Sequence, residues 1–354
     1  MAGNGRGKVL RTSSNKYDKG LSVLEQYDLV SESTCRGRGS LLCQTDQGLK
    51  MIKPYTGSVK RLEKINEILE HLKCSGHENV DRVLRNKEGQ LLTVDSEGYA
   101  YLVKDWWDVR ECEVRLEGDV LLSMELMAQM HKDMFLLYDG VCEQENLLEL
   151  YRKHNQQMKK IRTYIRDRKQ KSIFEYELLE RIGEYLELGT RVVKWMEALE
   201  YEKIRQRDLD MGSVCHGMCN QHNFLLAGDK AALVNFDHFF YGNHTADVAQ
   251  FLRKVMEKHN WDIELGQKMI AAYESICPMS LEERKLLAIR MSYPEKFWKI
   301  ANYYYNNNKA FLPEKNMDKL QVLIEQKDKW MSFLEVVFGK ELRDLGDFKT
   351  RRKP

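Results

Sequence analysis

The chain has 354 residues, which is enough for two domains that each bury a hydrophobic core. Its 56 lysine and arginine residues balance 54 acidic residues, so net charge gives no strong attraction to nucleic acid or to a membrane surface. No run of about 18 apolar residues occurs and residues 1–20 are polar, which predicts no transmembrane span, no secretory signal and a disordered N-terminus. The eight cysteines are scattered, which favours reduced thiols and synthesis in the cytoplasm.

Strand-like runs separated by turns occupy residues 33–54. Gly37 and Gly39 form a first corner, and Asp46-Gln47-Gly48 supplies the next turn. In a kinase-like N-terminal lobe, such a corner lies over the nucleotide phosphates, and the next strand brings a lysine to them, which is the place of Lys53. A Gly-x-Gly corner is a weak signal on its own, because most such corners are only turns.

An amphipathic helix is predicted over residues 58–72, because leucine and isoleucine recur there on one helical face. Glu63 or Glu67 on this helix could pair with Lys53, as the equivalent acid does in kinases, or both could be solvated. Residues 80–103 predict three strands separated by two glycine-containing turns. These strands would complete a small antiparallel sheet.

The rest of the chain is mostly helical. Residues 106–109 predict a linker whose two tryptophans pack or line a nucleotide cleft. His131 falls on the apolar face of the predicted helix 120–137, where a buried and hydrogen-bonded histidine is a simpler interpretation than a ligand. The basic segment 152–171 predicts a solvated helix face, with contact to an acidic partner as the alternative. Further helices are expected at 174–201, 247–254, 261–276, 280–291, 296–305 and 317–338.

The segment 215–223 has the residue spacing of a kinase-like catalytic loop. Such loops carry a histidine, then an aspartate base and, some residues later, an asparagine that holds a metal ion. This chain supplies His216 and Asn223, but the base position holds Met218, which cannot accept a proton. Loss of a general base typically costs about 10²–10⁴-fold in rate, so the loop predicts an impaired enzyme.

A short buried strand is predicted over residues 233–237. Where kinases place an Mg²⁺-binding aspartate, this chain has Asn235, whose neutral oxygen is a weaker ligand. Residues i and i+2 of a strand face the same way, so Asp237 is the alternative ligand after a shift in register. The candidate metal ligands are therefore Asn223, Asn235 and Asp237, and the candidate catalytic set is His216, Asn223 and Asp237.

Two other kinds of site could use the same loop. Cys215, His216, Cys219 and His222 carry the thiol and imidazole groups that zinc binds, although their spacing differs from that of standard zinc sites. A hydrolase built on Cys219 and His222 would need a glycine-rich turn at the nucleophile, and none surrounds this cysteine. Both are alternatives to the kinase-like interpretation.

Five strings carry a family resemblance: MIKPY at 51–55, HGMCNQHN at 216–223, VNFDH at 234–238, DVAQFLRK at 247–254 and YPEKFWKIANYYYN at 293–306. Through them the chain resembles the CotS-like spore-coat proteins of endospore-forming bacteria, which share the fold of aminoglycoside and choline phosphotransferases. The last string is the most specific, although it has no evident catalytic logic.

The resemblance implies an α+β fold with two lobes, like that of protein kinases. A small antiparallel N-terminal lobe with one helix would span residues 21–105, a mostly helical lobe residues 106–340, and a basic tail residues 341–354. The resemblance also implies that spore-coat proteins are the partners and that the chain resides in the spore coat. A nucleotide is a further candidate partner, whereas nucleic acid is not.

The resemblance also implies roles for single residues. Asn223 would hold the metal and Asp247 would brace the catalytic loop. The residues that would bind the nucleotide are Gly37, Gly39, Lys53 and Glu63. No cofactor follows from the sequence alone, and ATP and Mg²⁺ are those that the resemblance allows. The leading interpretation is a catalytically impaired pseudokinase in spore-coat assembly; the alternative is an ATP- and Mg²⁺-dependent small-molecule phosphotransferase that uses Asn223 and Asp237.

Overall fold

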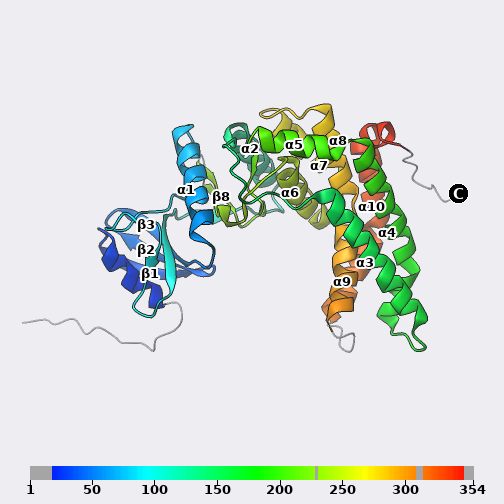
Figure 1. The fold of residues 1–354 in the computed structure, drawn as a ribbon, viewed down its shortest axis with the longest axis horizontal. Coiled ribbons are helices and arrows are strands. Elements are labelled where there is room, and N and C mark those ends of the chain that lie inside the picture. The colour runs from blue at the N-terminus through cyan, green and yellow to red at the C-terminus, as the bar shows by residue number, and fades with distance from the viewer. Residues whose placement is uncertain (1–17, 228–229, 308–313, 347–354) are drawn as a thin grey trace, which may run out of the picture. The chain divides into compact units, whose positions relative to one another are not determined.

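The structure is a computed structural model that describes residues 18–227, 230–307 and 314–346. Its contacts divide the chain into two compact units, which adjoin in the sequence at Val109 and Arg110 (Figure 1). We call them the N-terminal unit and the helical unit. The predicted disordered N-terminus and basic tail lie largely outside the described residues. Within the described part, Asp18–Gln26 form a 3-10 helix, η1, and the last helix continues to Asp344.

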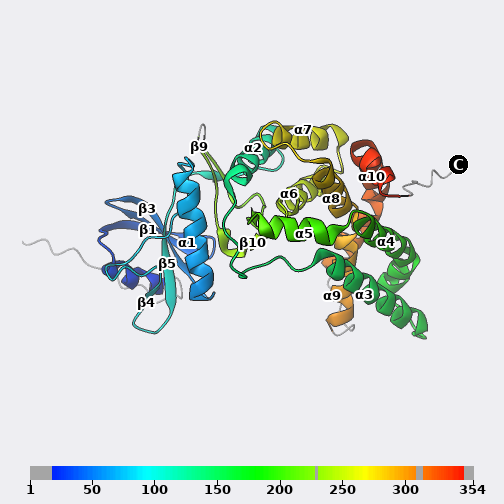
Figure 2. The ribbon, with the colours of Figure 1, turned by 45° about the horizontal axis from the view of Figure 1, so that its top comes forward.

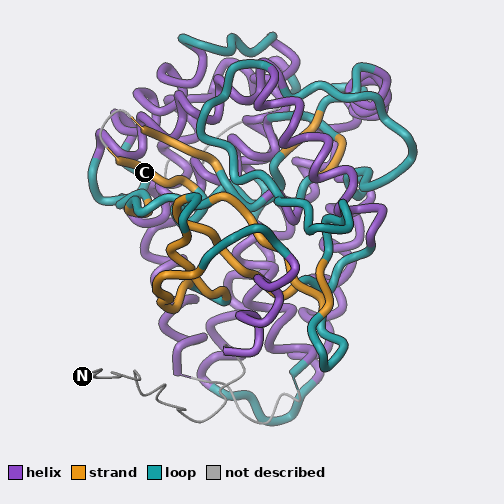
Figure 3. Tube along the Cα trace, turned by 90° about the vertical axis from the view of Figure 1, so that its left-hand side faces the viewer, coloured by secondary structure: helices purple, strands orange, loops and turns teal. Residues whose placement is uncertain are grey.

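A five-stranded antiparallel sheet forms most of the N-terminal unit, with the strand order β1-β2-β3-β5-β4 (strands are orange in Figure 3). The strands are β1 (Ser31–Gly37), β2 (Ser40–Thr45), β3 (Gly48–Pro54), β4 (Thr93–Val94) and β5 (Ala100–Asp105). The first three are joined by the two predicted turns, where Gly39 and Gly48 have positive φ. Glycine adopts this backbone conformation without the strain that a side chain would add.

The single long helix among the described residues of this unit is α1 (Val59–Cys74), which confirms the predicted amphipathic helix. It begins at Ser58, whose side chain accepts a hydrogen bond from the Arg61 N–H. Its buried face is mainly leucine and isoleucine. A separate apolar cluster joins residues of η1, including Leu24 and Tyr27, to Ile52 and Val103 of the sheet.

The prediction of a regular strand at the start of segment 80–103 is wrong. Only Val83 forms a β-bridge there, to Lys104. Polar side chains organise this stretch instead: Asp81 makes a fully buried ion pair of 2.6 Å with Lys104. The Asn86 side chain accepts hydrogen bonds from the N–H groups of two following residues, which closes a turn that a strand could not contain.

The helical unit contains nine α-helices and three short strand pairings among its described residues. Its helices are α2 (Glu117–Asp133), α3 (Leu147–Asp167), α4 (Ile173–Ala198), α5 (Tyr201–Asp210), α6 (Thr245–Lys258), α7 (Ile263–Glu274), α8 (Leu281–Ser292), α9 (Glu295–Asn306) and α10 (Glu314–Asp344). Helices α3, α4, α9 and α10 pack together, and α8 packs against α6 and α10 (Figure 2). No helix in the described residues is long and apolar enough to cross a membrane.

The strands of the helical unit frame the loop that the sequence analysis singled out. They are β6 (Arg110–Glu111), β7 (Val214–Cys215), β8 (Phe224–Ala227), β9 (Lys230–Leu233) and β10 (Phe240–Tyr241). Strand β7 pairs with β10, and β8 pairs with β6 and β9. The helix predicted at 174–201 is confirmed as α4, which ends at Ala198; Glu200 then adopts a left-handed conformation with φ of 53°, and a separate helix, α5, follows.

Candidate functional site

The loop after β7 is held by one buried carboxylate. Asp247 lies in the first turn of α6 and is 1% exposed. Its Oδ2 accepts the backbone N–H of His216 at 2.6 Å, and its Oδ1 accepts that of Gly217 at 2.8 Å. Gly217 has φ of +80°, and a Cβ there would lie 2.0 Å from the carbonyl oxygen of His238. Only glycine therefore fits between the carboxylate and this backbone.

The His216 side chain closes the same loop from inside. Its Nδ1 accepts the backbone N–H of Met218 at 3.1 Å, so in a neutral ring the proton is on Nε2. Nε2 then donates to the carbonyl oxygen of Val234 at 2.9 Å. The imidazole is fully buried and thus links the loop to the segment after β9, with both nitrogens used in holding the backbone.

Asp247 is in turn surrounded by groups from distant parts of the sequence. His131 of α2 lies 3.3 Å from Asp247 Oδ2 through Nε2 and 2.8 Å from the Tyr273 hydroxyl through Nδ1. Burial alone would raise the pKa of Asp247, but the hydrogen bonds from His131 and the loop hold it below its ordinary value. The prediction that His131 is a buried, hydrogen-bonded residue is confirmed.

At the base position, the Met218 side chain is 37% exposed and offers no proton acceptor. Its backbone carbonyl accepts the Asn223 Nδ2–H at 2.9 Å, which fixes the orientation of that amide and leaves Oδ1 on the other side. Oδ1 accepts an N–H from Asn235 Nδ2 at 3.0 Å. The two residues at the metal positions therefore bond to each other through neutral amides.

The prediction of a strand over residues 233–237 is wrong. Strand β9 ends at Leu233, Asn235 adopts a left-handed conformation with φ of 68°, and η2 (Phe236–His238) follows as a 3-10 turn. Asparagine tolerates this conformation better than most side chains. Because the backbone is not extended, the argument that Asn235 and Asp237 face the same way does not apply. Asp237 is half-buried in the turn.

Comparison with known proteins assigns the chain to a family. A family model described as "Spore coat putative kinase YutH" matches residues 21–337. The chain belongs to this family. The resemblance inferred from sequence and the α+β kinase-like fold are both confirmed.

Two curated spore-coat relatives come from Bacillus subtilis (strain 168). Spore coat protein S is 24% identical over 165 residues, and endospore coat-associated protein YutH is 22% identical over 139 residues. The matches cover 46% and 39% of this chain, and they span less than half of each relative, 47% and 40% of its length. These relatives place the family in the spore coat.

Solved structures share the fold. An aminoglycoside phosphotransferase from Alicyclobacillus acidocaldarius has a TM-score of 0.83 at 16% identity, over 94% of this chain and 98% of the other. A spectinomycin phosphotransferase in complex with ADP and spectinomycin has a TM-score of 0.54 at 13% identity, over 91% and 97% of the two chains. An amicoumacin kinase in complex with AMP-PNP and Ca²⁺ has a TM-score of 0.52 at 13% identity, over 92% and 91%.

The two cysteines of the loop at 215–223 bear on the zinc and hydrolase alternatives. Both Cys215 and Cys219 are fully buried, and burial raises the pKa of each thiol, which disfavours the thiolate that binds metal or attacks a substrate. Cys215 directs its Sγ to the carbonyl oxygen of Asn243 at 3.2 Å, and His222 pairs with Glu111. No group of three or more histidine, cysteine or acidic side chains suited to a metal occurs among the described residues. The zinc and hydrolase alternatives are therefore not supported.

The candidate nucleotide residues belong to the N-terminal unit. Gly37 and Gly39 lie at the corner between β1 and β2, as the sequence indicates. Lys53 is half-buried in β3, opposite Leu102 of β5. Glu63 is exposed on α1. The neighbouring candidate acid, Glu67, lies 2.7 Å from the ammonium of Lys64.

Three residues at this loop were not found by sequence reasoning. Tyr273 and His244 complete the surroundings of His131, the first by a hydrogen bond and the second by ring stacking with centroids 4.2 Å apart. Glu111 reaches His222 from a different strand. All three contacts join residues more than 100 positions apart in the sequence, so no local pattern marks them.

Proposed function

We propose that this chain is a kinase-like protein of the spore coat that does not transfer phosphate and that acts in coat assembly by binding other coat proteins. Family membership supports the spore-coat setting. On this proposal the chain is made in the cytoplasm and then enters the coat. A fluorescent fusion should form a ring around the developing spore. A fusion that stays diffuse in the mother cell would contradict this location.

The observation that carries the loss of transfer is the hydrogen bond from the Asn235 amide to Asn223 Oδ1. Phosphoryl transfer depends on a cation held by anionic oxygens and on a carboxylate that orients the attacking hydroxyl. Here Asn223 Oδ1 already accepts an N–H from Asn235, so Asn235 presents its NH₂ group to it and not an oxygen. Met218 takes the position of the base. Asn223 and Asn235 therefore offer Mg²⁺ no anionic oxygen, which supports the loss of a metal-dependent step.

The N-terminal unit keeps the residue types that would contact phosphates, namely the glycine corner and Lys53. Two proteins of the same fold were solved with ADP and with AMP-PNP. Nucleotide binding without transfer is therefore compatible with the proposal, and ATP would then be a ligand of the coat protein rather than a substrate.

Thermal unfolding with ATP, in the presence and absence of Mg²⁺, tests the proposal. A ligand at a hundred times its Kd adds about 2.7 kcal/mol to the free energy of unfolding. We expect any ATP-induced rise in Tm to be the same with and without Mg²⁺, and no ADP to form. The double variant Met218→Asp, Asn235→Asp should gain a Mg²⁺-dependent rise, whereas the neutral control Met218→Asn should not.

The alternative is an active phosphotransferase that uses ATP and Mg²⁺ with Asn223 and Asp237 on the metal. It predicts slow, Mg²⁺-dependent ADP formation by the native chain. That activity should disappear in Asp237→Asn and persist in a control at the exposed His238, His238→Gln. Such a result would overturn the proposal, because it would show that Asp237 replaces the missing carboxylates.

A further inference from the structure

A large cavity lies within the helical unit and borders the catalytic-like loop at Gly217. Its volume is about 870 Å³, which falls in the range of small-molecule sites. Gly217 and Asp247 form one border, and residues of α3, α6 and α9 form most of the wall. Met218, Asn223 and Asn235 are not among the residues that line it.

The cavity gives a structural role to the family string YPEKFWKIANYYYN. That string contains the whole of α9, and Glu295, Lys296, Lys299, Ile300 and Tyr303 from it line the cavity. The remaining aromatic residues of the string anchor the wall by packing. Tyr293 stacks on Tyr151 with centroids 3.7 Å apart, and Trp298 stacks on His154 at 3.4 Å. The family string at 293–306, which suggests no catalytic role, therefore forms part of the cavity wall.

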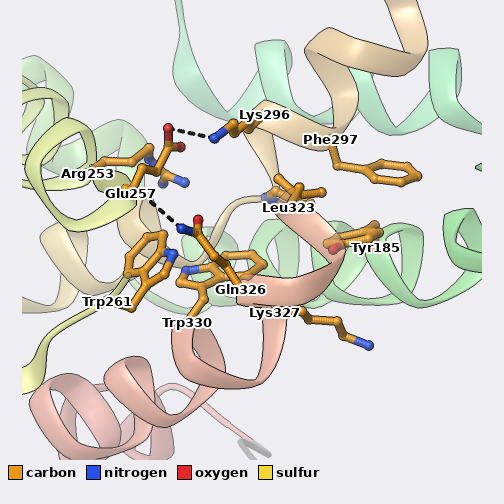
Figure 4. Close-up of a pocket in the computed structure, with 11 residues that line it drawn as sticks. Tyr185, Arg253, Glu257, Trp261, Lys296, Phe297, Leu323, Gln326, Lys327 and Trp330 are labelled. Carbon is orange, nitrogen blue, oxygen red and sulfur yellow. Dashed lines mark hydrogen bonds and ion pairs between the residues drawn. The ribbon is translucent and has the colours of Figure 1, made fainter. Parts of the chain in front are cut away.

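The lining of this cavity is cationic. Six lysine or arginine residues line it against three acids, and each acid is already engaged. Asp247 holds the loop, Glu295 pairs with Lys299, and Glu257 pairs with Lys296 at 3.0 Å. Figure 4 shows this last pair at the edge of a neighbouring cavity of about 20 Å³, in which Lys296 points toward Glu257. The other four cations are Arg253, Lys254, Arg290 and Lys319.

Arg290 is the exceptional member of this set. It is 7% exposed, yet none of the described carboxylates lies within ion-pair distance of its guanidinium. Its one side-chain hydrogen bond is a long contact of 3.4 Å from Nη2 to the neutral Gln144 Oε1, and its Nε has no partner among the described residues. A buried charge is costly unless it is paired, so this guanidinium lacks the partner that its position demands.

Two more buried nitrogens on the same cavity lack hydrogen-bond partners among the described residues. They are Nδ1 of His154, which is 6% exposed, and Nδ2 of Asn316, which is 8% exposed. Buried polar atoms in native proteins are nearly always hydrogen-bonded, and exceptions call for an explanation. Three residues with such exceptions line one cavity, which indicates that its polar wall is not satisfied within the described chain.

We propose that this cavity binds a small anionic molecule bearing phosphate or carboxylate groups, with Arg290 as its charged anchor. A planar guanidinium matches the paired oxygens of both groups. The buried position of the anchor and the volume of the cavity fit a small molecule rather than an acidic peptide. This ligand is independent of nucleotide binding by the N-terminal unit and of any phosphate transfer.

The test compares the native chain with Arg290→Met and with Arg207→Met, a control at a half-exposed arginine that pairs with Glu282. Thermal unfolding and isothermal titration would use inorganic phosphate, citrate, and sodium chloride at the same ionic strength. We expect phosphate or citrate to raise Tm in the native chain and in Arg207→Met, and the affinity to fall at least tenfold in Arg290→Met. Arg290→Lys keeps the positive charge but cannot make the paired hydrogen bonds of a guanidinium. It should bind the anions more weakly than the native chain and more tightly than Arg290→Met.

Three results would overturn the proposal: equal shifts with chloride and with the two anions, an unchanged affinity in Arg290→Met, or binding of polyglutamate by a chain that ignores phosphate and citrate. Folding of Arg290→Met is checked by circular dichroism. If that variant does not fold, Arg290→Gln, which leaves a polar group beside Gln144, carries the same comparison.

Discussion

The helical unit contains two polar centres that border the same glycine, and they differ in how their buried groups are paired. At the loop centre, His216, Asn223 and Asp247 all find partners within the chain. At the cavity, Arg290 lacks a carboxylate and two neighbouring residues carry nitrogens without partners in the described structure. The three residues that hold the loop are paired within the chain, whereas the cavity buries a guanidinium without a carboxylate partner.

This difference distinguishes polar groups that stabilise the fold from polar groups that are available to bind a ligand. A centre whose polar groups satisfy one another stabilises the fold and has little left to offer a substrate. A centre that buries a charge without a partner costs stability, and a cost of this kind is usually retained for binding or catalysis. The comparison predicts that substitutions in the loop frame affect mainly stability and that substitutions in the cavity affect mainly binding.

The largest expected effect is on the loop frame. Gly217→Ala adds a Cβ at φ of +80° and 2.0 Å from a backbone carbonyl oxygen, so the loop must move away from Asp247. We expect a loss of more than about 3 kcal/mol in the free energy of unfolding, measured by urea denaturation. Gly140→Ala is the matched control, because Gly140 has φ of +82° with no atom near its Cβ position. That variant should lose only about 1–2 kcal/mol, and equal losses would contradict the role of the loop.

A smaller effect is expected from acid. His244 is buried and stacks on His131, and burial, reinforced by the neighbouring His131, lowers the pKa of His244 to about 3. The folded chain therefore binds fewer protons than the unfolded chain, whose histidine titrates near 6.5. The stability present above pH 6.5 should fall as the pH drops below that value, by roughly 2 kcal/mol at pH 5.

The variant His244→Gln removes this titration. The loss of unfolding free energy between pH 7 and pH 5 should shrink by about 2 kcal/mol relative to the native chain. The exposed His238→Gln should leave that loss unchanged. Since Asp208 acts in the opposite direction, its pKa being raised to about 6 by burial, only the difference between variants is diagnostic. An unchanged pH profile in His244→Gln would show that this histidine does not contribute.

Local signals in the sequence predicted the elements that depend on neighbours along the chain. The glycine turns, the serine that begins α1 and the spacing of His216 and Asn223 all lie within a few residues of what they determine. The family resemblance then supplied the fold, because strings spread over most of the chain matched together. All of these signals can be recognised in the sequence without knowing how the helices and strands pack.

The errors have a common physical origin. The apolar run Leu233–Phe236 looks like a strand, but the left-handed backbone of Asn235 ends it, and that conformation depends on contacts with Asn223. In the same way, Arg290 is unremarkable in sequence. Its lack of a carboxylate emerges only when α8 packs against its neighbours. Contacts between residues that are not close neighbours in the sequence decide both features, and no local pattern records them.

The smallest change in the free energy of unfolding is expected for a substitution at the base position, Met218. Met218 contributes only its backbone N–H and carbonyl to the loop, and its side chain is 37% exposed. Met218→Asp should therefore change the free energy of unfolding by less than about 0.5 kcal/mol in urea. Asn223→Ala, which leaves the Asn235 amide without its acceptor, should cost about 1–3 kcal/mol. If Met218→Asp is equally costly, the methionine is a structural requirement; if it is neutral, folding stability does not explain why the acid is absent from this position.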